Sequence, residues 1–186
     1  MDALEGFTVR EIANNLRAYE GNASKEYFRA LNQFIPEKYR FKERSQHPAT
    51  DVANAMLNYG YTIIRSTTAR AVIAAGLHPS IGLHHSNDSN PLRLVDDLIE
   101  PFRPIIDLKI WQLQQQKETE ITPQTKRTLV RTLYDDMQTN AGTTPVAVCI
   151  QKLATSLAQV YTGERKQLDL PLPGLPIALA SSLSSD

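Results

Sequence analysis

Apolar residues recur at every third or fourth position along most of the chain, a spacing that is typical of α-helices. The first predicted helix covers residues 9–33 and ends before Pro36. The second covers residues 52–75, with Asp51 as its N-cap. Because this second helix is apolar around much of its circumference, we expect it to be the central, buried helix.

Prolines mark the starts of most of the later helices, since proline is well tolerated in a first helical turn. The later predicted helices cover residues 90–100, 105–113, 122–137 and 146–161. No convincing alternation of apolar and polar residues predicts a strand. The chain is therefore expected to form one all-α bundle of about six helices over residues 1–166, followed by an extended or disordered Pro- and Ser-rich tail over residues 167–186.

Composition narrows the classes of protein that fit. The 186 residues hold 20 Lys and Arg against 20 Asp and Glu, which excludes a polycationic nucleic-acid coat but permits a locally basic groove. The one cysteine, Cys149, excludes a disulfide framework and a thiolate zinc site. Neither a signal peptide nor an apolar run of about 18 residues is present, so we expect a soluble, cytoplasmic protein without membrane contact.

Glu20 lies at the edge of the apolar stripe of the first predicted helix. A carboxylate this close to a core needs a partner, a proton or a metal ion. An ion pair with Arg17 and a metal site are both compatible with this position.

A second group of candidates follows the central helix. His84 and His85 lie in a loop, and Asp96, Asp97 and Glu100 follow on the next predicted helix, where residues three or four apart share a face. A solvated acidic helix face would explain the carboxylates, and so would a divalent cation that relieves their repulsion. Oxygen ligands with one imidazole favour Mg²⁺ or Mn²⁺ over structural zinc.

Bases alternate with aromatic residues in the loop between the first two helices. Such a run suits contacts with nucleic-acid phosphates, although a solvated loop has the same pattern. The basic residues are Lys38, Arg40, Lys42 and Arg44.

Four blocks of the sequence resemble the C-terminal α-helical catalytic domain of the CRISPR-associated spacer-acquisition integrase and endonuclease family, the universal CRISPR adaptation nuclease. The blocks are LRAYEGNASKEYF (residues 16–28), FKERSQHPATDVANAMLNYGYTIIRS (41–66), GLHPSIGLHH (76–85) and DDLIEPFRP (96–104). They stand in the family's order and at its spacing, and they cover about half of the chain.

The resemblance implies a metal site made of a glutamate in a Glu-Gly motif, a histidine and a second acid. By position these are Glu20, His85 and Glu100, with Asp97 as an auxiliary acid. His84 is the alternative histidine, because the assignment depends on the spacing from the preceding glycine.

The implied activity is metal-dependent joining of spacer DNA 3′-hydroxyl ends into the CRISPR array by transesterification, together with DNA nicking, in antiviral defence. Mg²⁺ or Mn²⁺ would be the cofactor, and double-stranded and branched DNA the substrates. Tyr59 and Tyr61 are expected to line the site, and the four basic loop residues, Lys38, Arg40, Lys42 and Arg44, to contact the DNA backbone.

The family also carries a β-rich N-terminal domain that contributes to homodimerisation and precedes the Glu-Gly helix. Here 19 residues precede Glu20, and they carry no strand signal, so we expect a fragment or a shortened natural version. In that case homodimer assembly and docking of the small partner subunit of the adaptation complex are open. The alternative function is a truncated, non-catalytic helical module that binds DNA or a partner protein.

Overall fold

The computed structural model describes residues 9–46, 48–118, 120–140 and 142–171. The described residues are mostly helical, which confirms the predicted fold class. The α-helices are α1 (Val9–Phe34), α2 (Val52–Ala74), α3 (Arg93–Ile99), α4 (Arg103–Gln115), α5 (Pro123–Arg131) and α6 (Val146–Tyr161). The described residues also form three short 3₁₀ turns, η2 (Glu37–Tyr39), η3 (Glu100–Phe102) and η4 (Thr132–Tyr134), and two strands, β1 (Asp136–Thr139) and β2 (Gly142–Pro145).

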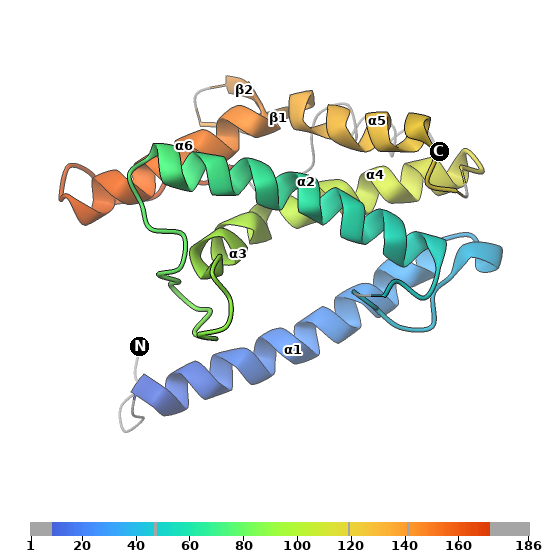
Figure 1. The fold of residues 1–186 in the computed structure, drawn as a ribbon, viewed down its shortest axis with the longest axis horizontal. Helices are drawn as coiled ribbons and strands as arrows, with labels where there is room; N and C mark the ends of the chain where they lie inside the picture. Colours follow the sequence, from blue (N-terminus) through green and yellow to red (C-terminus); the bar gives the residue numbers. More distant parts are fainter. Residues whose placement is uncertain (1–8, 47, 119, 141, 172–186) are drawn as a thin grey trace.

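Helix α2 is the centre of the molecule, as its apolar sequence predicts. It packs against α3, α4, α5 and α6 (Figure 1), and Met56, Leu57 and Ile64 are almost completely buried. Its first turn is fixed by Asp51, whose side chain accepts a hydrogen bond from the backbone N–H of Asn54 at 2.8 Å. The elements around α2 therefore share one continuous apolar core.

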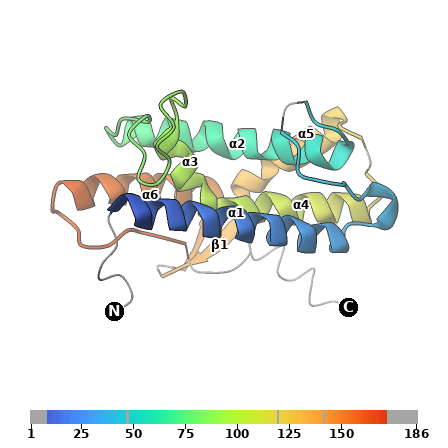
Figure 2. The same cartoon turned by 90° about the horizontal axis from the view of Figure 1, so that it is seen from below.

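Helix α1 lies to one side of this core and runs along α4 (Figures 1 and 2). Its second half carries the buried Phe28, and Ile35, just beyond its end, is also buried. In its first half Leu16 and Tyr19 are 53% and 73% exposed. The end of α1 is held by Trp111 of α4, whose indole N–H donates to the carbonyl of Phe34 at 2.9 Å.

A small antiparallel hairpin corrects the prediction that no strand is present. Met137, which the helical pattern placed in the helix over residues 122–137, lies buried in β1 opposite Thr144. Gly142 permits the turn, because its φ of +101° suits glycine far better than other residues. Each strand has only four residues, too few for an alternating pattern to stand out from the helical spacing around it.

The start of α3 also differs from the prediction. The helix begins at Arg93, and Leu92 is its N-cap. Asn90 instead closes a turn before the helix by accepting a hydrogen bond from the backbone N–H of Leu92 at 3.0 Å. Asparagine before proline therefore marks a turn here rather than the first turn of a helix.

The first residues of the predicted tail pack on the core. Leu168 is partly buried, and the backbone N–H of Asp169 donates to the hydroxyl of Ser156 at 2.8 Å. Residues 172–186 of that tail lie outside the described residues. No helix in the described part of the chain has both the length and the hydropathy that a membrane span needs.

Two glycines in helices should respond in opposite ways to alanine. A Cβ on Gly60 would lie 2.3 Å from the Cγ2 of Ile106, where α2 crosses α4, whereas a Cβ on Gly21 would meet nothing within 4 Å. We expect Gly60→Ala to lower the free energy of unfolding, because overpacking costs about 1–3 kcal/mol. Gly21→Ala should raise it by about 0.5–1 kcal/mol through helix propensity. Urea denaturation of both variants tests the pair, and equal effects would contradict the close crossing at Gly60.

Candidate active site

The carboxylate of Asp97 organises the loop between α2 and α3. One oxygen, Oδ2, accepts the backbone N–H groups of Leu83 at 2.5 Å and His84 at 3.1 Å, and the other, Oδ1, accepts the backbone N–H of His85 at 3.1 Å. Burial of this side chain raises the pKa of Asp97. The three backbone hydrogen bonds and one from the His85 ring together lower it by more, so the pKa of Asp97 lies below its usual value. The carboxylate therefore stays ionised and fixes three consecutive residues.

Gly82 makes this close approach possible. A Cβ at residue 82 would lie 2.4 Å from the carbonyl oxygen of His85, 2.8 Å from the Cβ of Arg93 and 3.0 Å from the Oδ2 of Asp97. The loop can therefore wrap around Asp97 only with glycine at this position.

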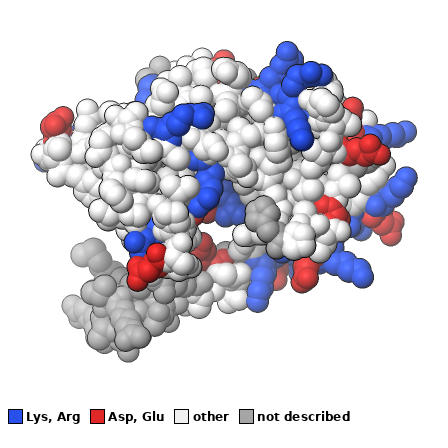
Figure 3. Space-filling model, in the orientation of Figure 1, with Lys and Arg blue, Asp and Glu red and all other residues white. Residues whose placement is uncertain are grey.

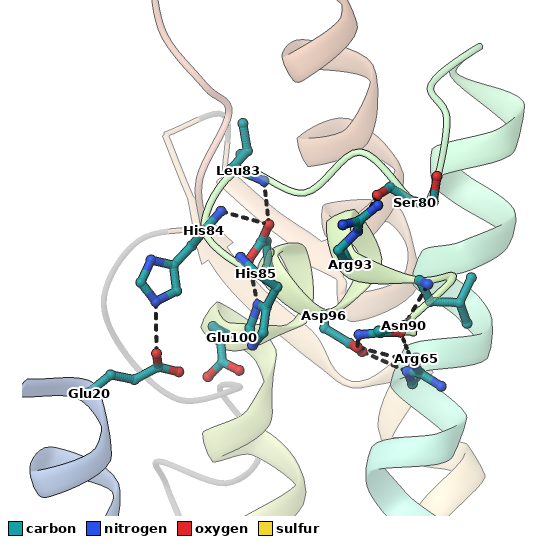
Figure 4. A network of polar contacts seen from close by, with 12 residues as sticks. Glu20, Arg65, Ser80, Leu83, His84, His85, Asn90, Arg93, Asp96 and Glu100 are labelled. Carbon is teal, nitrogen blue, oxygen red and sulfur yellow. Dashed lines mark hydrogen bonds and ion pairs between the residues drawn. The ribbon is translucent and has the colours of Figure 1, made fainter. Parts of the chain in front are cut away.

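The imidazole of His85 is oriented by the same carboxylate. Its Nδ1 lies 2.6 Å from the Oδ1 of Asp97, so the two residues are joined by a side-chain and a backbone hydrogen bond (Figure 4). A carboxylate on one ring nitrogen of a histidine is the usual arrangement that orients the other nitrogen, here Nε2, toward a metal ion.

Glu20 reaches the histidine loop from α1. Its Oε2 lies 2.9 Å from the Nε2 of His84, not of His85, and about half of the Glu20 side chain is exposed. Glu20, His84 and His85 line one cavity of about 380 Å³, together with Ser86 and Asn87. The structure thus brings the predicted glutamate to both histidines across 64 residues of sequence.

Glu100 follows the last residue of α3 as its C-cap, and its side chain lies beside His85 (Figure 4). Its carboxylate accepts a hydrogen bond from Arg103 at 2.9 Å. Asp96 faces away from this group and forms an ion pair with Arg65, at 2.6 Å between Oδ1 and Nε. The three acidic residues of this segment therefore do not form one solvent-exposed helix face, because Asp96, Asp97 and Glu100 each have a different partner.

A hollow of about 510 Å³ opens beside His85 and Glu100 and is lined by three arginines, Arg44, Arg65 and Arg103. The space-filling view shows some Lys and Arg atoms beside acidic atoms in the middle of the molecule, and others along its upper, right and lower edges (Figure 3). Arg65 and Arg103 are missing from the sequence-based candidates, because neither belongs to a basic run. The spacing in the sequence could have identified them, because Arg65 is one helical turn after Tyr61 and Arg103 is one turn after Glu100.

The predicted basic loop is divided by the fold. Arg44 points into the hollow, where its guanidinium donates to Asn54 at 3.0 Å and to Asn58 at 2.6 Å. Arg40 folds back onto the carbonyls of Gln33 and Ile35. Lys38 lies over the ring of its neighbour Tyr39, and Lys42 is exposed; neither they nor Arg40 line the hollow.

The two candidate tyrosines lie on different faces of α2, because residues two apart in a helix point in nearly opposite directions. Tyr61 lines the hollow, with the guanidinium of Arg103 4.6 Å from its ring centroid. Tyr59 faces α5, where the ammonium of Lys126 lies 5.5 Å from its ring centroid.

The donor chemistry of Glu20, His85 and Glu100 fits a hard divalent cation, with two carboxylates and an imidazole whose second nitrogen is already held. Within the described ranges, however, no three His, Cys, Asp or Glu side chains are close enough together to hold an ion. Glu20 is paired with His84 and Glu100 with Arg103. A bound cation would therefore have to replace these two side-chain contacts.

Solved structures of other proteins share this fold. A casposase bound to integration product matches 87% of this chain and 51% of its own, with a TM-score of 0.76 and 23% identity. A Cas1 protein from Thermotoga maritima matches 83% of this chain and 55% of its own, with a TM-score of 0.72 and 20% identity. This chain therefore shares the fold of about half of each of these two proteins.

The sequence then shows the family. Residues 2–136 match the family described as CRISPR associated protein Cas1, and the chain belongs to this family. It is 33% identical over 171 residues to the CRISPR-associated endonuclease Cas1 of Neisseria meningitidis, covering 88% of this chain and 53% of that protein. A relative from Archaeoglobus fulgidus is 36% identical over 143 residues, or 73% and 41% of the two chains. The chain therefore spans about half the length of the curated relatives it matches.

Replacing Gly82 by alanine should open the histidine loop. Because the backbone oxygen of His85 leaves no room for a Cβ, we expect Gly82→Ala to release the N–H groups of residues 83–85 from Asp97. Their amide proton resonances should move upfield and exchange faster, and stability should fall by about 1–3 kcal/mol. The exposed Gly21→Ala variant is the control, and unchanged amides at residues 83–85 would contradict the role given to Gly82.

Proposed function

We propose that this chain is the helical catalytic domain of a metal-dependent DNA endonuclease and integrase of CRISPR adaptation. The observation that carries the proposal is the placement of His85, oriented by Asp97, beside Glu100 at the edge of a hollow lined by three arginines. Membership of the Cas1 family supports the same reading. Residues 1–166 form the catalytic unit in this proposal.

Glu20, His85 and Glu100 are the proposed ligands of Mg²⁺ or Mn²⁺. When bound, the cation supplies charge neutralisation at the reacting phosphate and a template for in-line attack. Asp97 keeps His85 in the orientation that ligation requires, as an outer partner of the ligand. His84 would hold the Glu20 carboxylate beside the proposed site.

The proposed reaction is transesterification. A DNA 3′-hydroxyl attacks a phosphodiester phosphorus, the new P–O bond forms, and the old bond to the leaving strand breaks. Arg44, Arg65 and Arg103 would bind the phosphates on either side and offset the negative charge that develops. Water in place of the hydroxyl would give a nick, which accounts for nuclease activity at the same site.

The proposed partners follow from the same comparisons. Double-stranded and branched DNA are the substrates we propose. A chain of a solved Cas6-RT-Cas1–Cas2 complex shares the fold of this chain, with a TM-score of 0.72 and 19% identity. Homodimer formation, docking of a small adaptation subunit, a cytoplasmic location and backbone contacts by Lys38, Arg40 and Lys42 remain parts of this proposal.

A second candidate function is a helical module that binds DNA without turnover. The pairing of Glu20 with His84 and of Glu100 with Arg103 favours it, because both carboxylates already have a side-chain partner without a cation. This module would still offer the arginine-lined hollow to a phosphate backbone.

Activity on branched DNA separates the two candidates. We expect strand transfer and nicking with Mn²⁺ or Mg²⁺ and none with chelator, and a loss of at least about 100-fold in His85→Ala and in Glu100→Ala, because each removes a ligand. His78→Ala is the matched control, since His78 lies in the same loop and its ring hydrogen-bonds to the neighbouring Ser80. Full activity of the His85 and Glu100 variants would contradict the metal site, and a wild type that binds DNA without cleaving it would favour the second candidate.

Salt dependence tests the hollow itself. If Arg103 or Arg44 contacts a phosphate, then Arg103→Gln or Arg44→Gln should reduce the slope of log K against log salt concentration by about 0.9 for each lost contact. Arg127→Gln on α5 is the control, because that side chain is exposed and hydrogen-bonds to Gln124 away from the hollow. Fluorescence anisotropy with chelator present measures this binding apart from catalysis, and equal slopes for all variants would contradict the proposed contacts.

A further inference from the structure

The position of Glu20 depends on how α1 is held against the rest of the molecule. Around Glu20 the helix is exposed on its described faces, with Tyr19 73% exposed. Farther along, an apolar cavity of about 300 Å³ lies between α1 and α4 and is lined by Leu31, Leu108 and Trp111 among others. Close packing therefore does not by itself fix the spacing of the two helices in this region.

A polar contact bridges the two helices beside that cavity. The hydroxyl of Tyr27 donates to the Oδ2 of Asp107 on α4 at 2.5 Å. Tyr27 follows Glu20 by seven residues, which is two turns, so both side chains lie on the same face of α1. Because both residues lie on one continuous helix, we expect a shift of Tyr27 along or away from α4 to displace Glu20 as well.

Asp107 also binds a third helix. Its other oxygen, Oδ1, accepts a hydrogen bond from the hydroxyl of Tyr61 on α2, and the residue is only 2% exposed. Burial raises the pKa of Asp107, while the two tyrosine hydroxyls and the nearby Arg103 and Arg44 act in the opposite direction. Burial and the carboxylate both raise the pKa values of Tyr27 and Tyr61, which keeps the two hydroxyls protonated as donors.

The Tyr61 contact continues to the arginines of the hollow. The guanidinium of Arg103 lies 4.6 Å from the centroid of the Tyr61 ring, and that of Arg44 lies 5.4 Å away. Arg103 in turn donates to Glu100, and η3 leads directly from Glu100 into α4, the helix of Asp107. The buried carboxylate of Asp107 is therefore connected to the segments that carry Glu20 and Glu100 and to the arginines that line the hollow.

We propose that Asp107 is a positioning residue of the site, an inference that rests on the proposed function. Through Tyr27 it sets the place of Glu20 relative to His85 and Glu100. Through Tyr61 it supports the guanidinium groups of Arg44 and Arg103. Asp107 does not touch the substrate or the cation in this proposal.

Two conservative variants test the Tyr27 contact and the Tyr61 contact of Asp107 separately. Tyr27→Phe and Tyr61→Phe keep the ring and remove one hydroxyl each, and Tyr134→Phe, at an exposed tyrosine, is the matched control. For Tyr27→Phe we expect Mn²⁺ affinity, measured by calorimetry without DNA, to fall about 10-fold or more, as for other outer-shell partners. DNA affinity in chelator should stay unchanged. For Tyr61→Phe we expect the reverse pattern.

Amide hydrogen exchange distinguishes positioning from general stabilisation. In Tyr27→Phe the amides of α1 around Glu20 should exchange about 10-fold faster or more, while those in the middle of α2 and α6 stay as in the wild type. A purely structural role would raise exchange in all three helices together, which would overturn the proposal. Wild-type exchange in α1 of Tyr27→Phe would overturn it as well.

The same experiments keep the two proposals apart. A wild-type chain that binds no Mn²⁺ would contradict the proposed metal site, while the exchange of α1 amides would still decide the role of Asp107. A wild type that binds Mn²⁺ with an affinity that Tyr27→Phe leaves unchanged would overturn the positioning role alone. Asp107→Asn, where it folds, should combine the effects of both tyrosine variants.

Discussion

A carboxylate inside a loop can accept hydrogen bonds from backbone N–H groups, which in a helix or strand would be paired with backbone carbonyls. Asp97 does this for residues 83–85, because its two oxygens accept three consecutive backbone N–H groups and one ring nitrogen. Apolar burial contributes little to this part of the loop after α2, since Ile81 and Leu83 are exposed. Arg93 adds a hydrogen bond to the carbonyl of Ser80. The orientation of His85, the contact of His84 with Glu20 and the shape of the neighbouring hollow all depend on the Asp97 anchor. Gly82 is the steric condition that lets the backbone come so close.

Charge in this protein is arranged locally rather than in excess. The totals of acidic and basic residues cancel, yet Arg44, Arg65 and Arg103 line one hollow with Asp96 and Glu100. Each acid tethers an arginine or lies beside one, so the guanidinium groups are held in place before a phosphate arrives. Preorganised donors are more effective than mobile ones, because little reorganisation is needed when negative charge develops. A balanced net charge is therefore compatible with a site for a polyanion.

Much of the fold could be predicted from local rules. Asp51 is an N-cap where the sequence places it, and the apolar circumference of α2 identifies the central helix. The hairpin and the start of α3 could not be predicted in the same way. Met137 has the same spacing from Leu133 whether a helix continues or a strand begins, and only its pairing with Thr144 decides. Asn90 likewise suits a cap and a turn equally, and its contacts with Leu92 and Asp96 select the turn.

The sequence by itself determined the helical class, the family resemblance and the set of chemically active residue types, because these follow from spacing and motif order. Tertiary structure decided which of them meet. Glu20 faces His84 instead of His85, Asp96 turns to Arg65, and Arg44 separates from the rest of its basic run. These pairings join segments as far as 64 residues apart, and Asp107 and Tyr27 join segments 80 apart. Local periodicity fixes the face on which a residue lies, whereas the packing of whole helices fixes what that face meets.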